Sequence, residues 1–92
     1  MTKLKESYIE NHLTRCVHDA GGEVRKVQWV GRRGAPDRLV MLPHRVVWVE
    51  LKAPGKKAKP HQAREHARLR RYGLDVVVID SIEGVEELVK CT

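Results

Sequence analysis

Three short apolar runs limit the folds open to this chain more than any other feature. They are Leu39–Leu42, Val46–Val49 and Val76–Ile79, each four residues long. Runs of that length suit buried strands and are far too short to cross a membrane as a helix. Only Pro43-His44-Arg45 separates the first two runs, which predicts a β-hairpin.

Helical patterns precede and follow this hairpin. From Lys3 to Ala20 apolar side chains recur at helical spacing, and Gly21-Gly22 then ends the pattern. A second helix is expected from Pro60, which suits a first helical turn, to about Tyr72, and Gly73 closes it. These patterns predict a chain in which helices and strands alternate.

The remaining elements complete an order of αβββαβα. Strands are predicted at Glu23–Val30, Asp37–Met41, Val46–Lys52 and Asp75–Asp80. The third of these is apolar on both faces, which is typical of a central strand buried on both sides. A last helix should run through Lys90, capped by Asp80 or Ser81, and Asp80 with Glu83 resembles a capping box.

The hairpin should bring two acidic residues together. A symmetric hairpin centred on Pro43-His44 pairs residues whose numbers sum to 87, so Asp37 lies opposite Glu50. Their Cβ atoms should then be about 4.5–5.5 Å apart, and Lys52 should leave the same face of the strand. Because proline disfavours a tight primed turn, we expect a four-residue loop, Leu42–Arg45.

Two carboxylates in this arrangement favour a bound cation. Opposed like charges are destabilising, and burial beside valines raises the cost of each charge. A divalent ion such as Mg²⁺ suits one or two carboxylates together with waters and phosphates, and Lys52 could orient water or stabilise a phosphate. Taken singly, Glu50 also fits a polar strand end, Asp37 a turn residue, and Lys52 a surface lysine.

The sequence Pro36-Asp37 followed by Glu50-Leu51-Lys52 resembles the PD-(D/E)XK nuclease signature. More narrowly, the chain resembles the VRR-NUC family, the virus-type replication-repair nucleases. The motifs behind that resemblance are Glu10, Gly31-Arg32-Arg33-Gly34-Ala35-Pro36-Asp37, Glu50-Leu51-Lys52, Gln62 and Leu69-Arg70-Arg71-Tyr72-Gly73. The resemblance spans nearly the whole chain. It implies an α/β, restriction-endonuclease-like core with a mixed central sheet flanked by helices, in one domain over residues 1–92.

The resemblance also implies a role for each site residue. The implied ligands of Mg²⁺ or Mn²⁺ are oxygen donors from Glu10, Asp37, Glu50 and the backbone carbonyl of Leu51. Lys52 would position the attacking water, and Gln62 would support Lys52 or a phosphate. The reaction would be phosphodiester hydrolysis by a metal-activated water. From the residues alone, Glu10 fits a solvated helix face equally well, and Gln62 an ordinary first-turn residue.

The chain has a surplus of positive charge, 18 lysines and arginines against 12 acidic residues, or +6. That surplus favours a polyanionic partner such as nucleic acid. The residues expected to contact phosphates without reading sequence are Arg32, Arg33, Lys56, Lys57, Lys59 and Arg64. A charged, flexible loop explains the lysines equally well. The five histidines have no convincing zinc-ligand spacing, and Trp29 and Trp48 are expected in the core.

We therefore expect a metal-dependent endonuclease that acts on DNA. The resemblance to stand-alone phage proteins further implies a homodimer that cuts branched DNA such as Holliday junctions, because paired cuts need two sites related by symmetry. The alternative is a non-catalytic nucleic-acid-binding module with the same fold. Cys16 and Cys91 form no C-x-x-C pair and no apolar leader begins the chain. These features predict a cytoplasmic protein, in a bacterial host if a phage encodes it, with no membrane or small-molecule cofactor.

Overall fold

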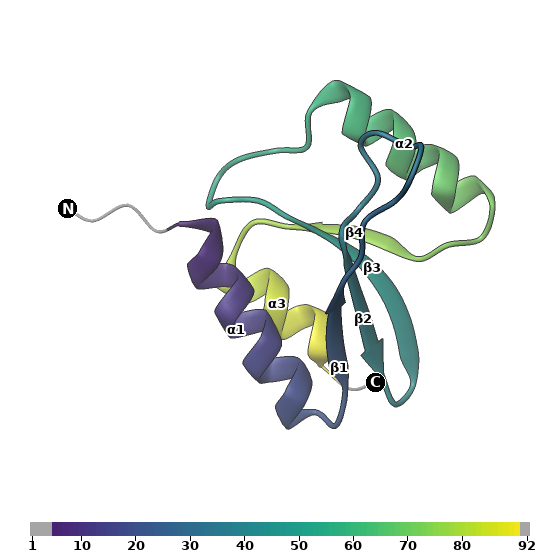
Figure 1. Cartoon of the computed structure of the whole chain (residues 1–92). Coiled ribbons are helices and arrows are strands. Elements are labelled where there is room, and N and C mark those ends of the chain that lie inside the picture. The colour runs from purple at the N-terminus through teal and green to yellow at the C-terminus, as the bar shows by residue number, and fades with distance from the viewer. Residues whose placement is uncertain (1–4, 91–92) are drawn as a thin grey trace.

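A computed structural model describes residues 5–90 and has the predicted element order (Figure 1). The elements are α1 (Glu6–Asp19), β1 (Glu23–Lys26), β2 (Arg38–Leu42), β3 (Arg45–Leu51), α2 (Pro60–Arg71), β4 (Val76–Ile79) and α3 (Ile82–Val89). Two features of the sequence analysis lie outside the described residues: the start of the first helix at Lys3 and the thiol of Cys91. The α/β class is confirmed.

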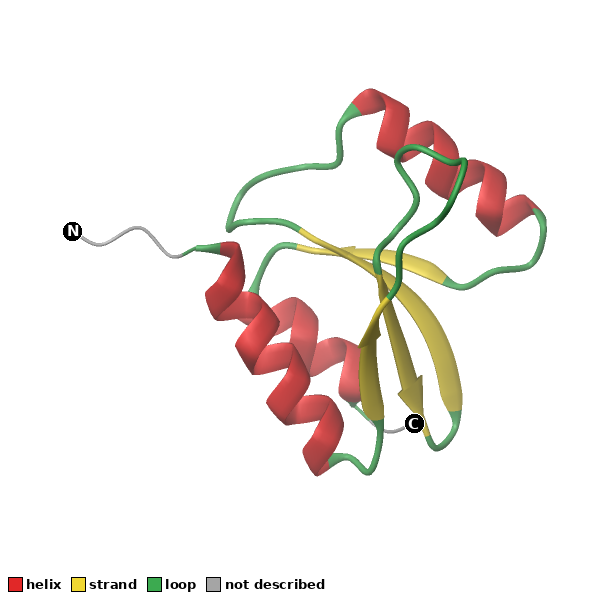
Figure 2. Cartoon of the chain, in the orientation of Figure 1, coloured by secondary structure: helices red, strands yellow, loops and turns green. Residues whose placement is uncertain are grey.

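The strands form one mixed sheet in the order β1-β2-β3-β4. The β1–β2 and β2–β3 pairs are antiparallel, and the β3–β4 pair is parallel. A parallel pair needs a crossover connection, which α2 provides. Figure 2 shows α1 and α3 together on one side of the sheet and α2 on the other.

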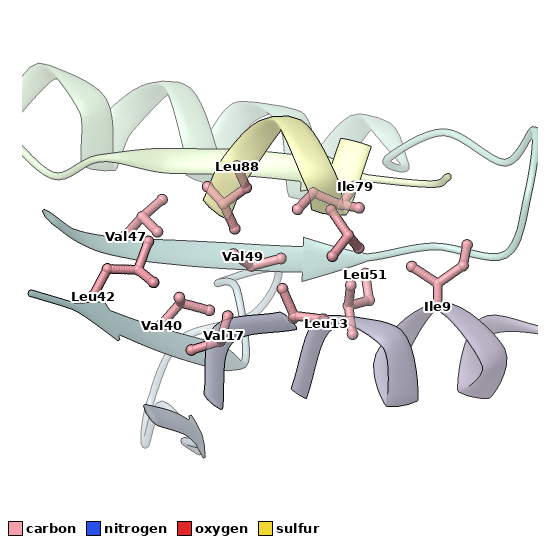
Figure 3. Packing of buried hydrophobic residues seen from close by; sticks show 11 residues of the cluster. Ile9, Leu13, Val17, Val40, Leu42, Val47, Val49, Leu51, Ile79 and Leu88 are labelled. Carbon is pink, nitrogen blue, oxygen red and sulfur yellow. The ribbon is translucent and has the colours of Figure 1, made fainter. Parts of the chain in front are cut away.

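The hydrophobic core fills the side of the sheet that faces α1 and α3 (Figure 3). Alternate residues of β3 point into it, and the helix stripe predicted from the sequence packs against them. The fully buried members include Ile9, Leu13, Val17, Val40, Val47, Val49 and Val85. The core therefore fixes which face each β3 residue occupies, and it leaves Glu50 on the α2 side.

The prediction that β3 is buried on both faces is wrong for the first half of the strand. Val46 is 58% exposed, and Trp48 is half-buried and packs against Trp29 with ring centroids 4.9 Å apart. The α2 side of β3 is covered near Glu50, which meets His66, but not near Val46. The two tryptophans thus form a partly exposed pair rather than core.

The strand predicted at Glu23–Val30 ends at Lys26 instead. Glycines with positive φ at Gly31 (78°) and Gly34 (81°) turn the next residues out of the sheet and back. We call residues 27–37 the return loop. Its ends are joined because the Val27 amide donates to the Asp37 carbonyl at 2.9 Å. The loop returns the chain to the sheet directly at Asp37.

Two smaller expectations are also corrected. The hairpin turn has two residues, Pro43 and His44, because Leu42 already pairs with Arg45. No non-glycine residue between 5 and 90 has positive φ, so the turn avoids the primed geometry that proline forbids. Of the two caps expected for α3, Ser81 is the one observed, since its hydroxyl accepts from the Gly84 amide at 2.9 Å, and the capping box expected at Asp80 is corrected.

Over residues 5–90, no helix has the length and apolar character required to cross a membrane.

Candidate active site

The hairpin register is the predicted one. Paired residues sum to 87 along the β2–β3 ladder, from Leu42–Arg45 to Arg38–Val49. The ladder stops one pair short of Asp37 and Glu50, and the Asp37 carbonyl accepts from the Val27 amide on the β1 side. The Asp37 carboxylate is nevertheless close enough to raise the pKa of Glu50. Hairpin geometry therefore brings the two acidic residues to one end of the sheet.

Glu50 is a buried carboxylate, only 8% exposed. Burial is the main cause that raises its pKa above the ordinary value for glutamate, and the nearby charges of Asp37 and Glu6 add to the effect. Lys52 opposes the shift: its Nζ lies 3.6 Å from Oε2 of Glu50. Lys52 therefore offsets only part of the cost of burying the charged form of this carboxylate.

Arg38 holds the other acidic residues of the site. It is buried and donates to the carboxylate of Glu10, and its Nη1 lies 2.9 Å from Oδ1 of Asp37. Lys26 also lies near Glu10, with its Nζ 3.9 Å from Oε2. Glu10 is thus neutralised by Arg38, while Asp37 remains mostly exposed, at 59%.

Sequence reasoning missed both Arg38 and Glu6. Arg38 lies in the expected strand, yet only the packing of β2 against α1 reveals that Glu10 is its partner. Glu6 stands four residues before Glu10 and so shares its face of α1. That spacing was the available indication that a second carboxylate of this helix could reach the site.

Gln62 has a structural partner in the chain. Its Oε1 accepts from the backbone amide of Lys59 at 2.9 Å and so closes the first turn of α2. Lys59, Lys56 and Lys57 are exposed in the loop that joins β3 to α2. Lys56 and Lys57 line a hollow of about 300 Å³.

The return loop is fastened to α2 by Arg32 and Glu65. Nη2 of Arg32 lies 2.6 Å from Oε1 of Glu65 and Nε lies 3.4 Å from Oε2, a two-point contact. This hydrogen bond is the main cause that lowers the pKa of Glu65. Arg32, although 45% exposed, is therefore paired within the protein, whereas Arg33 and Arg64 are exposed and form no ion pair among the described residues.

Two basic hollows lie along the return loop. The first, of about 590 Å³, includes Asp37 in its lining, together with Lys26, Gln28, Trp29, Arg32 and Arg38 among others. The second, of about 470 Å³, lies between the return loop and α2 and is lined by Arg32, Arg33, His61, Arg64, Arg68 and Arg71 with Glu65. We call it the α2 hollow. Since Arg32 already binds its single carboxylate, the α2 hollow has a strong positive excess.

The donor set suits a hard divalent cation. No group of three or more His, Cys, Asp or Glu side chains in residues 5–90 is arranged to hold a metal ion. Two carboxylates, Asp37 and Glu50, and the Leu51 carbonyl are what the end of the hairpin offers. Mg²⁺ commonly binds through one or two carboxylates and keeps several waters. The raised pKa of Glu50, caused chiefly by burial, marks where an added cation would relieve the cost.

Known proteins resemble this chain along most of its length. A scan against protein-family profiles gives no match. The chain is 50% identical over 82 residues, 88% of each chain, to "Putative nuclease p44" of Acyrthosiphon pisum secondary endosymbiont phage 1. A solved "VRR_NUC domain" superimposes with a TM-score of 0.82 at 40% identity, over 94% of this chain and 95% of that one.

A second solved structure, a "VRR_NUC domain protein", superimposes with a TM-score of 0.72 over 96% of this chain and 87% of that one. At 18% identity it supports the fold alone. The two closer matches span nearly the full length of both partners and include the return loop, the hairpin and α2. The chain belongs to the VRR-NUC family of nucleases.

Proposed function

We propose that this protein is a divalent-metal-dependent endonuclease that hydrolyses phosphodiester bonds in DNA. The observation that supports this most directly is the buried carboxylate of Glu50, with Lys52 at 3.6 Å and Asp37 close enough to raise its pKa. A purely structural strand end would gain nothing from a buried carboxylate next to a second one.

Each residue of the site then has a task. Asp37 and Glu50, with the Leu51 carbonyl, would hold Mg²⁺ or Mn²⁺, which supplies Lewis acidity and a more acidic water when bound. Lys52, only 15% exposed and held by Glu50, would orient that water or a phosphate oxygen. Glu10 would act through Arg38, whose guanidinium contacts both Glu10 and Asp37.

Gln62 would contribute by fixing the start of α2, which in turn fastens the return loop. Its side-chain oxygen accepts from the Lys59 backbone, and Gly34 packs against the neighbouring turn of the helix. Gln62 therefore supports the site through the helix that covers it.

DNA would be held by the basic surfaces around the site. The α2 hollow presents exposed Arg33, Arg64, Arg68 and Arg71, and the lysines of the 52–59 loop add charge on the other side. Such contacts bind phosphates whatever the sequence. The site would then select its substrate by shape, which suits branched DNA.

A homodimer would supply the second site that symmetric cutting requires. We propose that two copies act together on branched DNA such as Holliday junctions, in the cytoplasm of a bacterial host, with residues 1–92 as one domain. Sedimentation of the protein alone and with a four-way junction tests the assembly. A monomer on the junction at all concentrations would rule out the symmetric arrangement.

A second candidate function is a non-catalytic nucleic-acid-binding module. The observation in its favour is that Arg38 already neutralises Glu10 and contacts Asp37, so one cation is built into the site. Such a module would bind DNA through the same basic hollows. It would have no use for Lys52 beside a buried Glu50.

Cleavage assays separate the two functions. The full chain is incubated with a four-way junction, linear duplex, single-stranded DNA and RNA, each with Mg²⁺, Mn²⁺ or EDTA. A nuclease cuts with metal, fails in EDTA, and loses its activity in Asp37→Asn, whereas the exposed control Asp19→Asn keeps it. Binding in EDTA with no cutting in any metal would establish the binding module instead.

A further inference from the structure

His66 is a buried side chain with an unpartnered nitrogen that faces the proposed metal site. It lies in α2, is 1% exposed, and its Nε2 has no hydrogen-bond partner in the described residues. That nitrogen is 3.6 Å from Oε1 of Glu50. A buried polar atom without a partner is uncommon and asks for an explanation.

The two oxygens of Glu50 face different side chains. Oε1 faces His66 and Oε2 faces Lys52, both at 3.6 Å. A side chain on each side of the carboxylate limits the orientations that its plane can take. At 3.6 Å, Nε2 and Oε1 lie close together but beyond hydrogen-bond distance, so the contact is a close approach of two polar groups. Residues that orient a metal-binding carboxylate in this way typically tune metal affinity.

The other nitrogen of His66 reaches the return loop. Burial is the main cause that lowers the pKa of His66, and a hydrogen bond with the backbone of Gly34 acts in the opposite direction. Because Nε2 has no hydrogen-bond partner, we infer that Nδ1 is the ring nitrogen that faces Gly34. Gly34 stands three residues before Asp37 in the chain. His66 therefore touches both segments that carry the proposed metal ligands.

We propose that His66 is a positioning residue that sets the separation of the Asp37 and Glu50 carboxylates and thereby the affinity for the divalent ion. This inference rests on the proposed function. Its neighbour Glu65 holds Arg32 of the same loop, so two adjacent residues of α2 fasten the segment that ends in Asp37. No other described histidine contacts Glu50 by salt bridge.

Three substitutions at His66 separate its two contacts. His66→Asn places an amide near the position of Nδ1, so it keeps the group facing Gly34 and removes the one facing Glu50. His66→Gln places an amide near Nε2 and does the reverse. His66→Leu keeps the bulk and removes both. His44→Asn, in the exposed hairpin turn, is the matched control.

The primary measurement is Mn²⁺ affinity of the full chain by titration calorimetry without DNA. Melting in EDTA reports folding, and kcat and KM on a junction follow. We expect His66→Asn and His66→Leu to weaken Mn²⁺ binding about 10–100-fold, with lost activity recovered at high Mn²⁺ and the KM for DNA unchanged. His66→Gln should bind Mn²⁺ more tightly than either. His44→Asn should match the wild type.

The outcomes that contradict the inference are distinct from those that contradict the nuclease. If wild-type protein binds Mn²⁺ and folded His66→Asn binds it within about twofold, His66 is structural only and the inference fails alone. If all three variants melt early in EDTA yet bind Mn²⁺ equally while folded, the same conclusion holds. If the wild type binds no Mn²⁺ at millimolar concentration with or without DNA, the proposed metal site fails, and this inference fails with it.

Discussion

Gly34→Ala should damage this protein far more than Gly31→Ala, although both glycines are in the return loop. Their backbones are nearly the same, with φ of 81° at Gly34 and 78° at Gly31. Their surroundings differ. A Cβ on Gly34 would lie 3.0 Å from the His61 carbonyl oxygen and 3.1 Å from Gln62 Cα, whereas a Cβ on Gly31 would meet nothing within 4 Å.

The expected magnitudes follow from these two terms. A side chain in the left-handed region costs roughly 1–2 kcal/mol, and both variants bear that cost. Crowding a packed contact costs about 1–3 kcal/mol more, and only Gly34→Ala bears this. The groups that would have to yield are backbone atoms of α2, so relaxation is limited. In a domain of this size each kcal/mol shifts the melting temperature by about 4–8 °C.

Thermal unfolding of both variants in EDTA is the assay. Gly34→Ala should melt at least about 4 °C below Gly31→Ala, and Gly55→Ala, with φ of 79° and nothing within 4 Å, should behave like Gly31→Ala. Cleavage well below the melting temperature should also fall in Gly34→Ala alone, because the loop delivers Asp37. Equal melting of all three variants would refute the claim that the return loop is fastened to α2 at Gly34.

Three further predictions test charge and metal. Burial raises the pKa of Glu50 in the folded protein, so the contribution of Glu50 to stability is present at acid pH and lost as pH rises through that pKa. Denaturant unfolding in EDTA should therefore find Glu50→Gln more stable than wild type near neutral pH, with the difference in unfolding free energy closing toward about pH 4. A difference that does not change with pH would contradict this. Millimolar Mn²⁺ should raise the melting temperature of the wild type and not that of Glu50→Gln, since an ion that binds only the folded state stabilises it by mass action. Arg64→Ala with Arg68→Ala should weaken DNA binding in EDTA and lower the slope of log affinity against log salt by about 2, whereas Arg15→Ala on the exposed face of α1 should leave the slope unchanged.

The fold was predictable wherever the sequence pattern is local. The helix stripe from Ile9 to Val17 and the apolar runs of β2, β3 and β4 determine their own elements, because each buries one face against the same core. The errors occur where a distant contact decides. The predicted strand past Lys26 gives way to the return loop, since Gly34 and Arg32 bind α2, more than 25 residues further along the chain. The sequence does not reveal such partners.

The same distinction between local pattern and distant contact applies to the residues of the candidate site. Asp37, Glu50 and Lys52 could be placed together from the sequence because hairpin register is arithmetic once the turn is known. Arg38 could not be assigned to Glu10, nor His66 to Glu50, because those contacts cross between layers and depend on how α1 and α2 pack.

This division also indicates how the site is built. The hairpin fixes the order and the face of the carboxylates, but Asp37 lies just beyond the ladder, and its carbonyl accepts from Val27 at the other end of the return loop. We therefore infer that its position depends on the contacts that hold the loop, which are Arg38 with Asp37 and Glu65 with Arg32. A chain that kept the hairpin motif but lost the α2 contacts would retain all three signature residues and still lack a defined distance between its two carboxylates. We therefore expect metal affinity to follow substitutions in α2 more closely than substitutions at exposed positions of the hairpin itself.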